Sequence, residues 1–135
     1  MIVVDSSAIV AIALREPGYK RLADRIGEET ASLISVANYV ECGQVLAQRQ
    51  LNAVQRALSE FVGLLNRLDL VLAPIDEAQA RVALDARVRY GRGFGHPARL
   101  NYSDCFAYAL AKTRALPLLY VGDDFRHTDV VSALP

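Results

Sequence analysis

The sequence predicts an α/β fold: a single domain over residues 1–135, in which a short parallel sheet is flanked by helices on both faces. A chain of 135 residues suits one domain and is too short for two of ordinary size. Its residues are 53% hydrophobic and 22% charged, which excludes a disordered chain and provides for a core. Short apolar runs alternate with helical patterns, and this alternation indicates parallel strands joined by helical crossovers.

Four short apolar runs are expected to form the strands of this sheet. The first, residues 2–4, contains only β-branched side chains, which is typical of a strand buried on both faces. The others lie at residues 32–35, 70–72 and 118–121, and residues 130–131 are expected to add a short fifth strand.

Helical patterns fill the intervals between these strands. Asp5, Ser6 and Ser7 can cap the first helix, and the break at Pro17 separates it from the second. Residues 91–101 form the only long irregular stretch. The expected helices cover residues 8–15, 17–26, 36 to at least 46, 52–67, 76–90 and 104–114.

Composition also sets expectations for location. No segment approaches the ~18 uncharged apolar residues that a membrane span needs, and the opening Met-Ile-Val-Val-Asp lacks the basic start of a secretory signal. The two cysteines, Cys42 and Cys105, are too few for a disulfide scaffold. We therefore expect a cytoplasmic protein with no membrane contact.

Charge is balanced overall but unevenly distributed along the chain. There are 15 basic and 15 acidic residues, so the net charge predicts no partner. Residues 81–99, however, hold five arginines against one aspartate, in an otherwise acidic chain. A nucleic-acid backbone is one partner for such a stretch, and a solvated helix end followed by a loop is the alternative interpretation.

Acidic residues gather near the expected strand ends. Asp5 ends the first strand, and Asp123 and Asp124 follow the fourth strand after a glycine. Asp104 begins the helix that leads to the fourth strand, and Glu41 lies on the helix after the second. Parallel sheets bind ligands beyond the carboxyl ends of their strands, so these side chains are expected to meet there. Taken singly, each is also explained as a helix cap, a turn residue or a solvated helix position.

Carboxylates that meet in one pocket favour a metal site. Several of them cannot all stay ionised at close range without a compensating cation. Mg²⁺ or Mn²⁺ is the expected ion, because carboxylate and water oxygens are its preferred ligands, and such ions promote phosphodiester hydrolysis. The hydroxyls of Ser6 and Ser7 are placed to orient Asp5 or a bound water from outside the ligand set, and they can equally cap the helix.

Several segments resemble one known family. The opening residues 2–8, an apolar strand followed by Asp-Ser-Ser-Ala, resemble the first motif of PIN-domain proteins, particularly the VapC toxins of bacterial toxin–antitoxin pairs, in which Ser or Thr follows the Asp. Residues 35–41 resemble the second motif, a strand entering a helix that carries Glu. Residues 90–98, 100–106 and 122–129 resemble one VapC subgroup closely, so that the resemblance covers the whole chain.

The resemblance implies a PIN fold and a Mg²⁺- or Mn²⁺-dependent endoribonuclease toxin that cleaves RNA and inhibits translation. It also implies a homodimer and neutralisation by a cognate VapB antitoxin. Asp5, Glu41 and Asp104 match the family's acidic ligand positions. Asp124 is the expected fourth ligand, with Asp123 as its substitute, because the family's last motif often separates two acids by one residue whereas these are adjacent.

The arginines of the basic stretch are expected to contact the RNA backbone, where they would add affinity without sequence choice. These are Arg87, Arg89, Arg92 and Arg99.

Three alternative functions remain open from the sequence. A haloacid-dehalogenase-like phosphatase would use Asp5 as a covalent nucleophile, although Ser7 stands where that chemistry usually has a second Asp. Metal-independent RNA cleavage would use His96 and His127 as acid and base. A non-catalytic regulator would bind an antitoxin and operator DNA without needing clustered acids.

Overall fold

The four strands of the sheet are parallel, so their carboxyl ends lie on the same side of the sheet. In the computed structural model, which describes residues 1–135, the strand order is β3–β2–β1–β4 and every pairing is parallel. The strands are β1 (Val3–Val4), β2 (Ser32–Ser35), β3 (Leu70–Ala73) and β4 (Leu118–Leu119).

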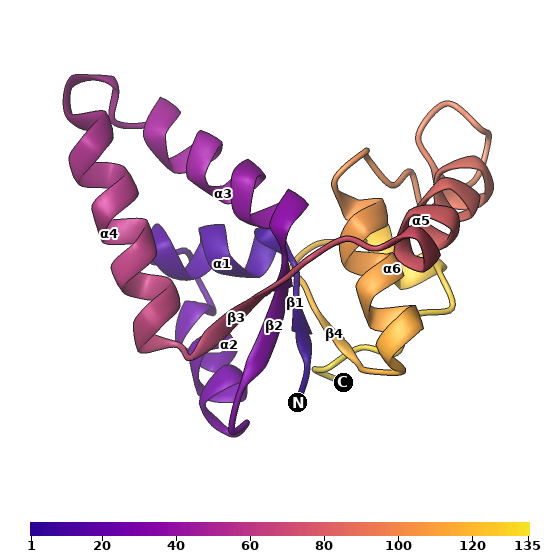
Figure 1. Ribbon diagram of the computed structural model, residues 1–135, viewed down its shortest axis with the longest axis horizontal. Helices are drawn as coiled ribbons and strands as arrows, with labels where there is room; N and C mark the ends of the chain where they lie inside the picture. The colour runs from indigo at the N-terminus through magenta and orange to yellow at the C-terminus, as the bar shows by residue number, and fades with distance from the viewer.

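Helices cover both faces of the sheet, as the sequence predicts. Four of them, α1 to α4, lie on one side, and α5 and α6 lie on the other (Figure 1). Two separate apolar cores result, because neighbouring residues of a strand point to opposite faces: Val4 packs into the first core and Val3 into the second. The helices are α1 (Ser6–Ala13), α2 (Tyr19–Gly27), α3 (Val36–Gln48), α4 (Val54–Arg67), α5 (Glu77–Tyr90) and α6 (Asp104–Arg114), with short 3₁₀ turns η1 (Leu51–Ala53) and η2 (Asp124–His127). None of these helices is both long and apolar enough to cross a membrane.

Two of the expected strands differ from the structure. Val130 and Val131 form no strand; the chain makes only an isolated parallel bridge between Ser132 and Leu118. Strand β4 ends at Leu119 rather than at residue 121, because the backbone N–H of Val121 donates to the Ser7 hydroxyl instead of to a neighbouring strand. The helix expected at residues 8–15 begins earlier, at Ser6, because Asp5 caps it directly.

Hydrogen bonds and a helix cap bring several segments of the chain together at the carboxyl ends of the strands. Asp5 follows β1 and its backbone N–H donates to Leu119 O at 2.9 Å, which ties the first acidic residue to the end of β4. Ser35 ends β2 and caps α3 through its hydroxyl. The carboxyl ends of the strands and the starts of α1 and α3 therefore adjoin, as expected for a ligand-binding edge of a parallel sheet.

Candidate functional site

A pocket of about 260 Å³ brings together four of the acidic residues singled out in the sequence. Asp5, Glu41, Asp104 and Asp124 all line it, although they come from four separate segments. Ser6, Ser7 and Asn101 supply polar atoms to its wall, and Val10, Val45, Val121 and Phe125 supply apolar ones. Asp123 lines a different pocket and pairs with Arg126 at 3.2 Å.

Asp5 is fixed by the start of α1. Its Oδ2 accepts from the backbone N–H of Ser7 at 2.9 Å and from the Ser7 hydroxyl at 2.6 Å. The same hydroxyl accepts from Val121 N–H at 3.0 Å, so Ser7 joins Asp5 to the segment after β4. Only 2% of Asp5 is exposed, and this burial raises the pKa of its carboxyl to about 6, against the lowering effect of the Ser7 hydrogen bonds.

Asp104 lies in the first turn of α6 and is held by the preceding loop. Its Oδ2 accepts from Asn101 N–H at 2.9 Å, while Asn101 Oδ1 accepts from the Asp104 N–H at 2.8 Å. Burial, together with the nearby charges of Asp5, Asp124 and Glu41, raises the pKa of Asp104 to about 7. Asp104 lines the same pocket as these three acids.

Glu41 stands at the end of a chain of two hydrogen bonds, one from a hydroxyl and one from an amide. The Ser6 hydroxyl donates to Glu41 Oε2 at 2.8 Å, and Asn38 Nδ2 donates to Ser6 Oγ at 2.9 Å. Asn38 belongs to this hydrogen-bond network, although the sequence analysis did not single it out as a site residue. Its sequence signal is its position on α3, three residues before Glu41 and therefore on the same helix face.

The donor set of this pocket suits a hard divalent cation. No lysine, arginine or histidine lines it, so no protein cation neutralises its four carboxylates. Two of these carboxylates have raised pKa values, which is the electrostatic signature of crowded, desolvated anions. The acids surround the pocket without forming a compact group of three or more metal-binding side chains. One oxygen of Asp5 instead accepts from Ser7 at the start of α1, and one oxygen of Asp104 accepts from Asn101 in the loop before α6.

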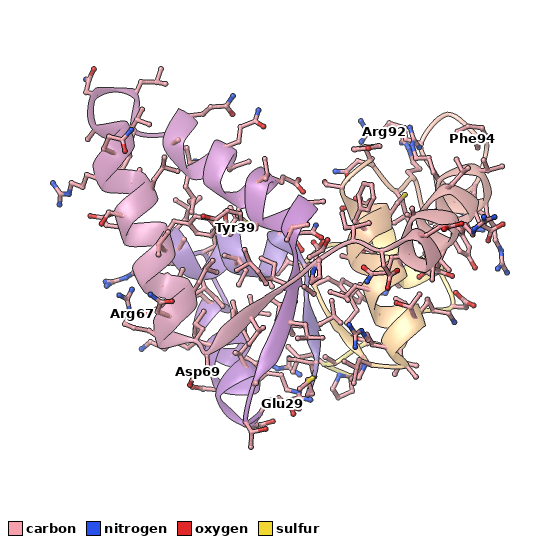
Figure 2. All side chains as sticks on the ribbon, viewed as in Figure 1. Glu29, Tyr39, Arg67, Asp69, Arg92 and Phe94 are labelled. Carbon is pink, nitrogen blue, oxygen red and sulfur yellow. The ribbon has the colours of Figure 1, made fainter.

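The arginine-rich stretch, residues 81–99, covers most of α5 and the loop that follows it, and none of its residues lines the acidic pocket. Arg92 and Phe94 lie on the segment that projects beyond the ends of α5 and α6 (Figure 2). Arg87 is partly buried, and its Nη1 donates to the carbonyl oxygens of Arg92 and Leu100 at 3.0 and 3.1 Å. Arg89 is exposed and places its guanidinium 4.8 Å from the centre of the Tyr90 ring. Arg87 thus holds the loop together, whereas Arg89, Arg92 and Arg99 are exposed to solvent.

The two histidines lie outside the acidic pocket. His96 Nδ1 accepts from Ala98 N–H at 3.1 Å, and its ring packs edge-on against Tyr90. His127 is an exposed residue in η2. Neither histidine lines the pocket that holds the four acids, so the geometry gives no support to an acid–base pair acting there.

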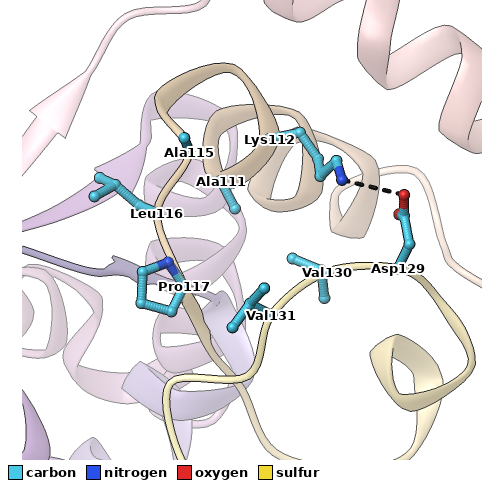
Figure 3. Close-up of a pocket in the computed structure, with 8 residues that line it drawn as sticks. All are labelled: Ala111, Lys112, Ala115, Leu116, Pro117, Asp129, Val130 and Val131. Atoms are coloured by element: carbon cyan, nitrogen blue, oxygen red, sulfur yellow. Dashed lines mark hydrogen bonds and ion pairs between the residues drawn. The ribbon is translucent and has the colours of Figure 1, made fainter.

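A second pocket, of about 350 Å³, lies between the end of α6 and the C-terminal segment (Figure 3). Asp129 bridges its rim by accepting from the Tyr108 hydroxyl at 2.7 Å and from Lys112 Nζ at 3.1 Å. Its lining is mostly apolar, including Leu116 and Val131. These contacts anchor the segment that follows Asp124 onto α6, and this pocket contains no cluster of acids.

Comparison with known proteins shows the family to which this chain belongs. A family model described as "PIN domain" matches residues 2–131. Ribonuclease VapC28 of Mycobacterium tuberculosis is 44% identical over 132 residues, which cover 98% of this chain and 97% of that protein. The crystal structure of Mycobacterium tuberculosis VapC20, a sarcin–ricin loop cleaving toxin, shares the fold with a TM-score of 0.75 at 15% identity, covering 97% of both chains. A toxin–antitoxin complex from Klebsiella pneumoniae contains a chain of the same fold, with a TM-score of 0.67 at 17% identity and 98% coverage of both chains. The chain belongs to the PIN-domain family, and within it to the VapC group.

Proposed function

We propose that this protein is a Mg²⁺- or Mn²⁺-dependent endoribonuclease, the toxin of a toxin–antitoxin pair, which cleaves RNA and thereby inhibits translation. The observation that carries this proposal is the pocket in which Asp5, Glu41, Asp104 and Asp124 converge without a basic side chain. Carboxylates at close range repel one another unless a bound cation compensates their charge. Family membership supports the same activity, because the relative of 44% identity is named a ribonuclease.

The four acids are the proposed ligands of the metal. When bound, the ion would supply the positive charge that stabilises the transition state of phosphodiester hydrolysis. The contribution of the chain is to orient the carboxylates: Ser7 holds one oxygen of Asp5, and Asn101 holds one oxygen of Asp104. Asp124 is the proposed fourth ligand in preference to Asp123, since it faces the shared pocket.

The exposed arginines in the last turn of α5 and in the loop that follows it are proposed to hold the RNA. Arg89, Arg92 and Arg99 are free to contact phosphates, which would add affinity and a dependence on salt without selecting a sequence. Arg87 was expected to do the same, but its guanidinium donates to two backbone carbonyls of the loop. Its contribution to RNA binding is therefore proposed to be indirect, through the shape of the loop.

Mapping of cleavage ends in total RNA tests the proposed activity. We expect cleavage with Mg²⁺ or Mn²⁺, none with EDTA, and none with Asp5→Asn. Asp76→Asn is the matched control, because Asp76 caps α5 away from the pocket and Asn caps a helix equally well. Cleavage that survives both EDTA and Asp5→Asn would contradict the proposal, and a trapped phospho-aspartate at Asp5 would favour the phosphatase reading.

A VapB-type antitoxin and a second copy of the chain are the proposed protein partners. The toxin–antitoxin complex with the same fold supports the first of these. An apolar groove of about 400 Å³ between α3 and α4, which includes Tyr39, Phe61 and the exposed Val40 and Val62, suits an amphipathic antitoxin helix. Size-exclusion chromatography with light scattering, with and without a VapB-type antitoxin, measures both associations. A monomeric mass that the antitoxin leaves unchanged would contradict both.

A further inference from the structure

Asn38 contacts three of the segments that form the acidic pocket. Its side chain is completely buried in the first turn of α3. Nδ2 lies 2.9 Å from Ser6 Oγ, 3.3 Å from the carbonyl oxygen of Ser103 and 3.4 Å from Asp5 Oδ1. One amide group therefore links the end of β1, the start of α1 and the residue that precedes Asp104.

The chemistry of the amide fixes the direction of this network. An amide nitrogen only donates, so Ser6 Oγ accepts from Asn38 and directs its single proton to Glu41. The reversed amide would place Oδ1 against Asp5 Oδ1 and the Ser103 carbonyl, neither of which has a proton to give when Asp5 is ionised. The hydrogen bonds therefore run from Asn38 to Ser6 to Glu41, and from Asn38 to Asp5.

This arrangement is maintained at a cost in stability. Asn38 Oδ1 is buried and has no hydrogen-bond partner. An unsatisfied buried acceptor destabilises the fold, so this oxygen gives no structural reason for an amide at this position. The donor side of the amide, which faces the acids, is the part that an apolar residue cannot replace.

We propose that Asn38 is a positioning residue: its amide holds Asp5 and, through Ser6, Glu41 in the arrangement that binds a divalent cation. The inference rests on the proposed metal-dependent function and deepens it, since the metal ligands are assigned there. Groups that orient metal ligands typically change metal affinity or activity by roughly 10- to 100-fold when they are removed.

A matched pair of substitutions tests this role. Asn38→Leu removes the donor while keeping a similar size, and Gln79→Leu makes the same kind of change at a site away from the acids. Gln79 is also a buried helical amide with an unpartnered oxygen, and its Nε2 donates only to Pro74 O. Mn²⁺ affinity is measured by titration followed by electron paramagnetic resonance, RNA cleavage by kcat and KM, and folding by thermal denaturation in EDTA.

We expect Asn38→Leu to bind Mn²⁺ about 10-fold or more weakly and to lower kcat with little change in KM, while it still unfolds cooperatively in EDTA. Gln79→Leu should match the wild type in Mn²⁺ affinity and kcat. Wild-type Mn²⁺ affinity in a folded Asn38→Leu variant would overturn the inference.

A second variant keeps the test decisive if Asn38→Leu fails to unfold cooperatively. Asn38→Thr retains one hydroxyl proton, which can serve Ser6 or Asp5 but not both, so we expect a several-fold loss of Mn²⁺ affinity. Unchanged affinity in Asn38→Thr would equally overturn the inference. A wild-type protein that binds no Mn²⁺ would instead contradict the proposed function itself, so the two failures are distinguishable.

Discussion

Ser6 donates its hydroxyl proton to Glu41 Oε2 at 2.8 Å, which joins the first turn of α1 to the middle of α3. Removing this hydroxyl should leave Glu41 without its side-chain donor and free to leave the pocket. We expect Ser6→Ala to lower kcat for RNA cleavage roughly 10-fold or more, in the range typical of groups that orient metal ligands. Ser6→Thr keeps the hydroxyl and should retain most of the activity, as measured on the same RNA. Equal kcat in Ser6→Ala and the wild type would mean that the bond has no role in catalysis.

The buried carboxyls of Asp5 and Asp104 should make the metal-free protein less stable as the pH rises. Both pKa values are raised in the folded state, Asp5 from 3.8 to about 6 and Asp104 from 3.8 to about 7. The folded protein therefore binds these protons more tightly than the unfolded chain, and the associated stability is complete below about pH 4 and is lost as the pH rises through about 7. For Asp5 the change corresponds to about 3 kcal/mol of unfolding free energy.

Asparagine at either position cannot ionise, so it removes the loss of stability that the buried carboxylate causes at high pH. In EDTA at pH 8, we expect Asp104→Asn to unfold at a higher urea concentration than the wild type, and the difference should disappear near pH 4. Urea denaturation followed by circular dichroism measures both midpoints. An Asp104→Asn variant that is less stable than the wild type at pH 8 would show that the Asn101 hydrogen bonds outweigh the burial of the charge.

Mg²⁺ should stabilise the protein more at pH 8 than at pH 5.5. Protons compete with the metal for Asp5 and Asp104, whose pKa values of about 6 and 7 leave both groups substantially protonated at the lower pH. A ligand that binds only the folded state raises its melting temperature by mass action. Differential scanning fluorimetry with Mg²⁺ or EDTA at the two pH values measures the effect. Equal increases at both pH values would place the bound ion elsewhere.

The fold follows from the sequence more completely than the site does. The strand at Ser32–Ser35 has its predicted bounds, because four residues between clear breaks and a helix start leave few alternatives. Strand β4 is shorter than expected because the Ser7 hydroxyl, far away in the sequence, captures the N–H of Val121. A local sequence pattern cannot predict a hydrogen bond between residues so far apart in the sequence.

Within the site, too, contacts between distant residues could not be predicted from the sequence. Asp5 and Asp104 could be singled out because carboxylates at strand ends and helix starts form a recognisable pattern. Asn38 could not, because the role proposed for it depends on Asp5 and Ser6, which lie 33 and 32 residues away in the sequence. The sequence does not indicate whether an arginine side chain faces a phosphate or a backbone carbonyl. Arg87 was therefore expected to bind RNA, although its guanidinium donates to backbone carbonyls.

Asp124 and Asp123 should differ in their importance although they are adjacent. Asp124 lines the acidic pocket, and its charge raises the pKa of Asp104. Asp123 points to another pocket, where it pairs with Arg126 in an exposed contact of little energetic value. We expect Asp124→Asn to weaken Mn²⁺ binding and cleavage roughly 10-fold or more, and Asp123→Asn to change them less than twofold. The reverse order in Mn²⁺ titrations would assign the fourth ligand to Asp123.

Arg92 and Arg87 should affect RNA cleavage in different ways. Arg92 is exposed on the loop, so Arg92→Ala should raise KM, leave kcat nearly unchanged and reduce the salt dependence of binding. Arg87→Ala should instead lower the melting temperature, because the carbonyls of Arg92 and Leu100 lose their shared donor. A steady-state series at several salt concentrations, combined with thermal denaturation, separates the two effects. If Arg87→Ala keeps the wild-type melting temperature and raises KM alone, its guanidinium leaves those carbonyls to contact RNA directly.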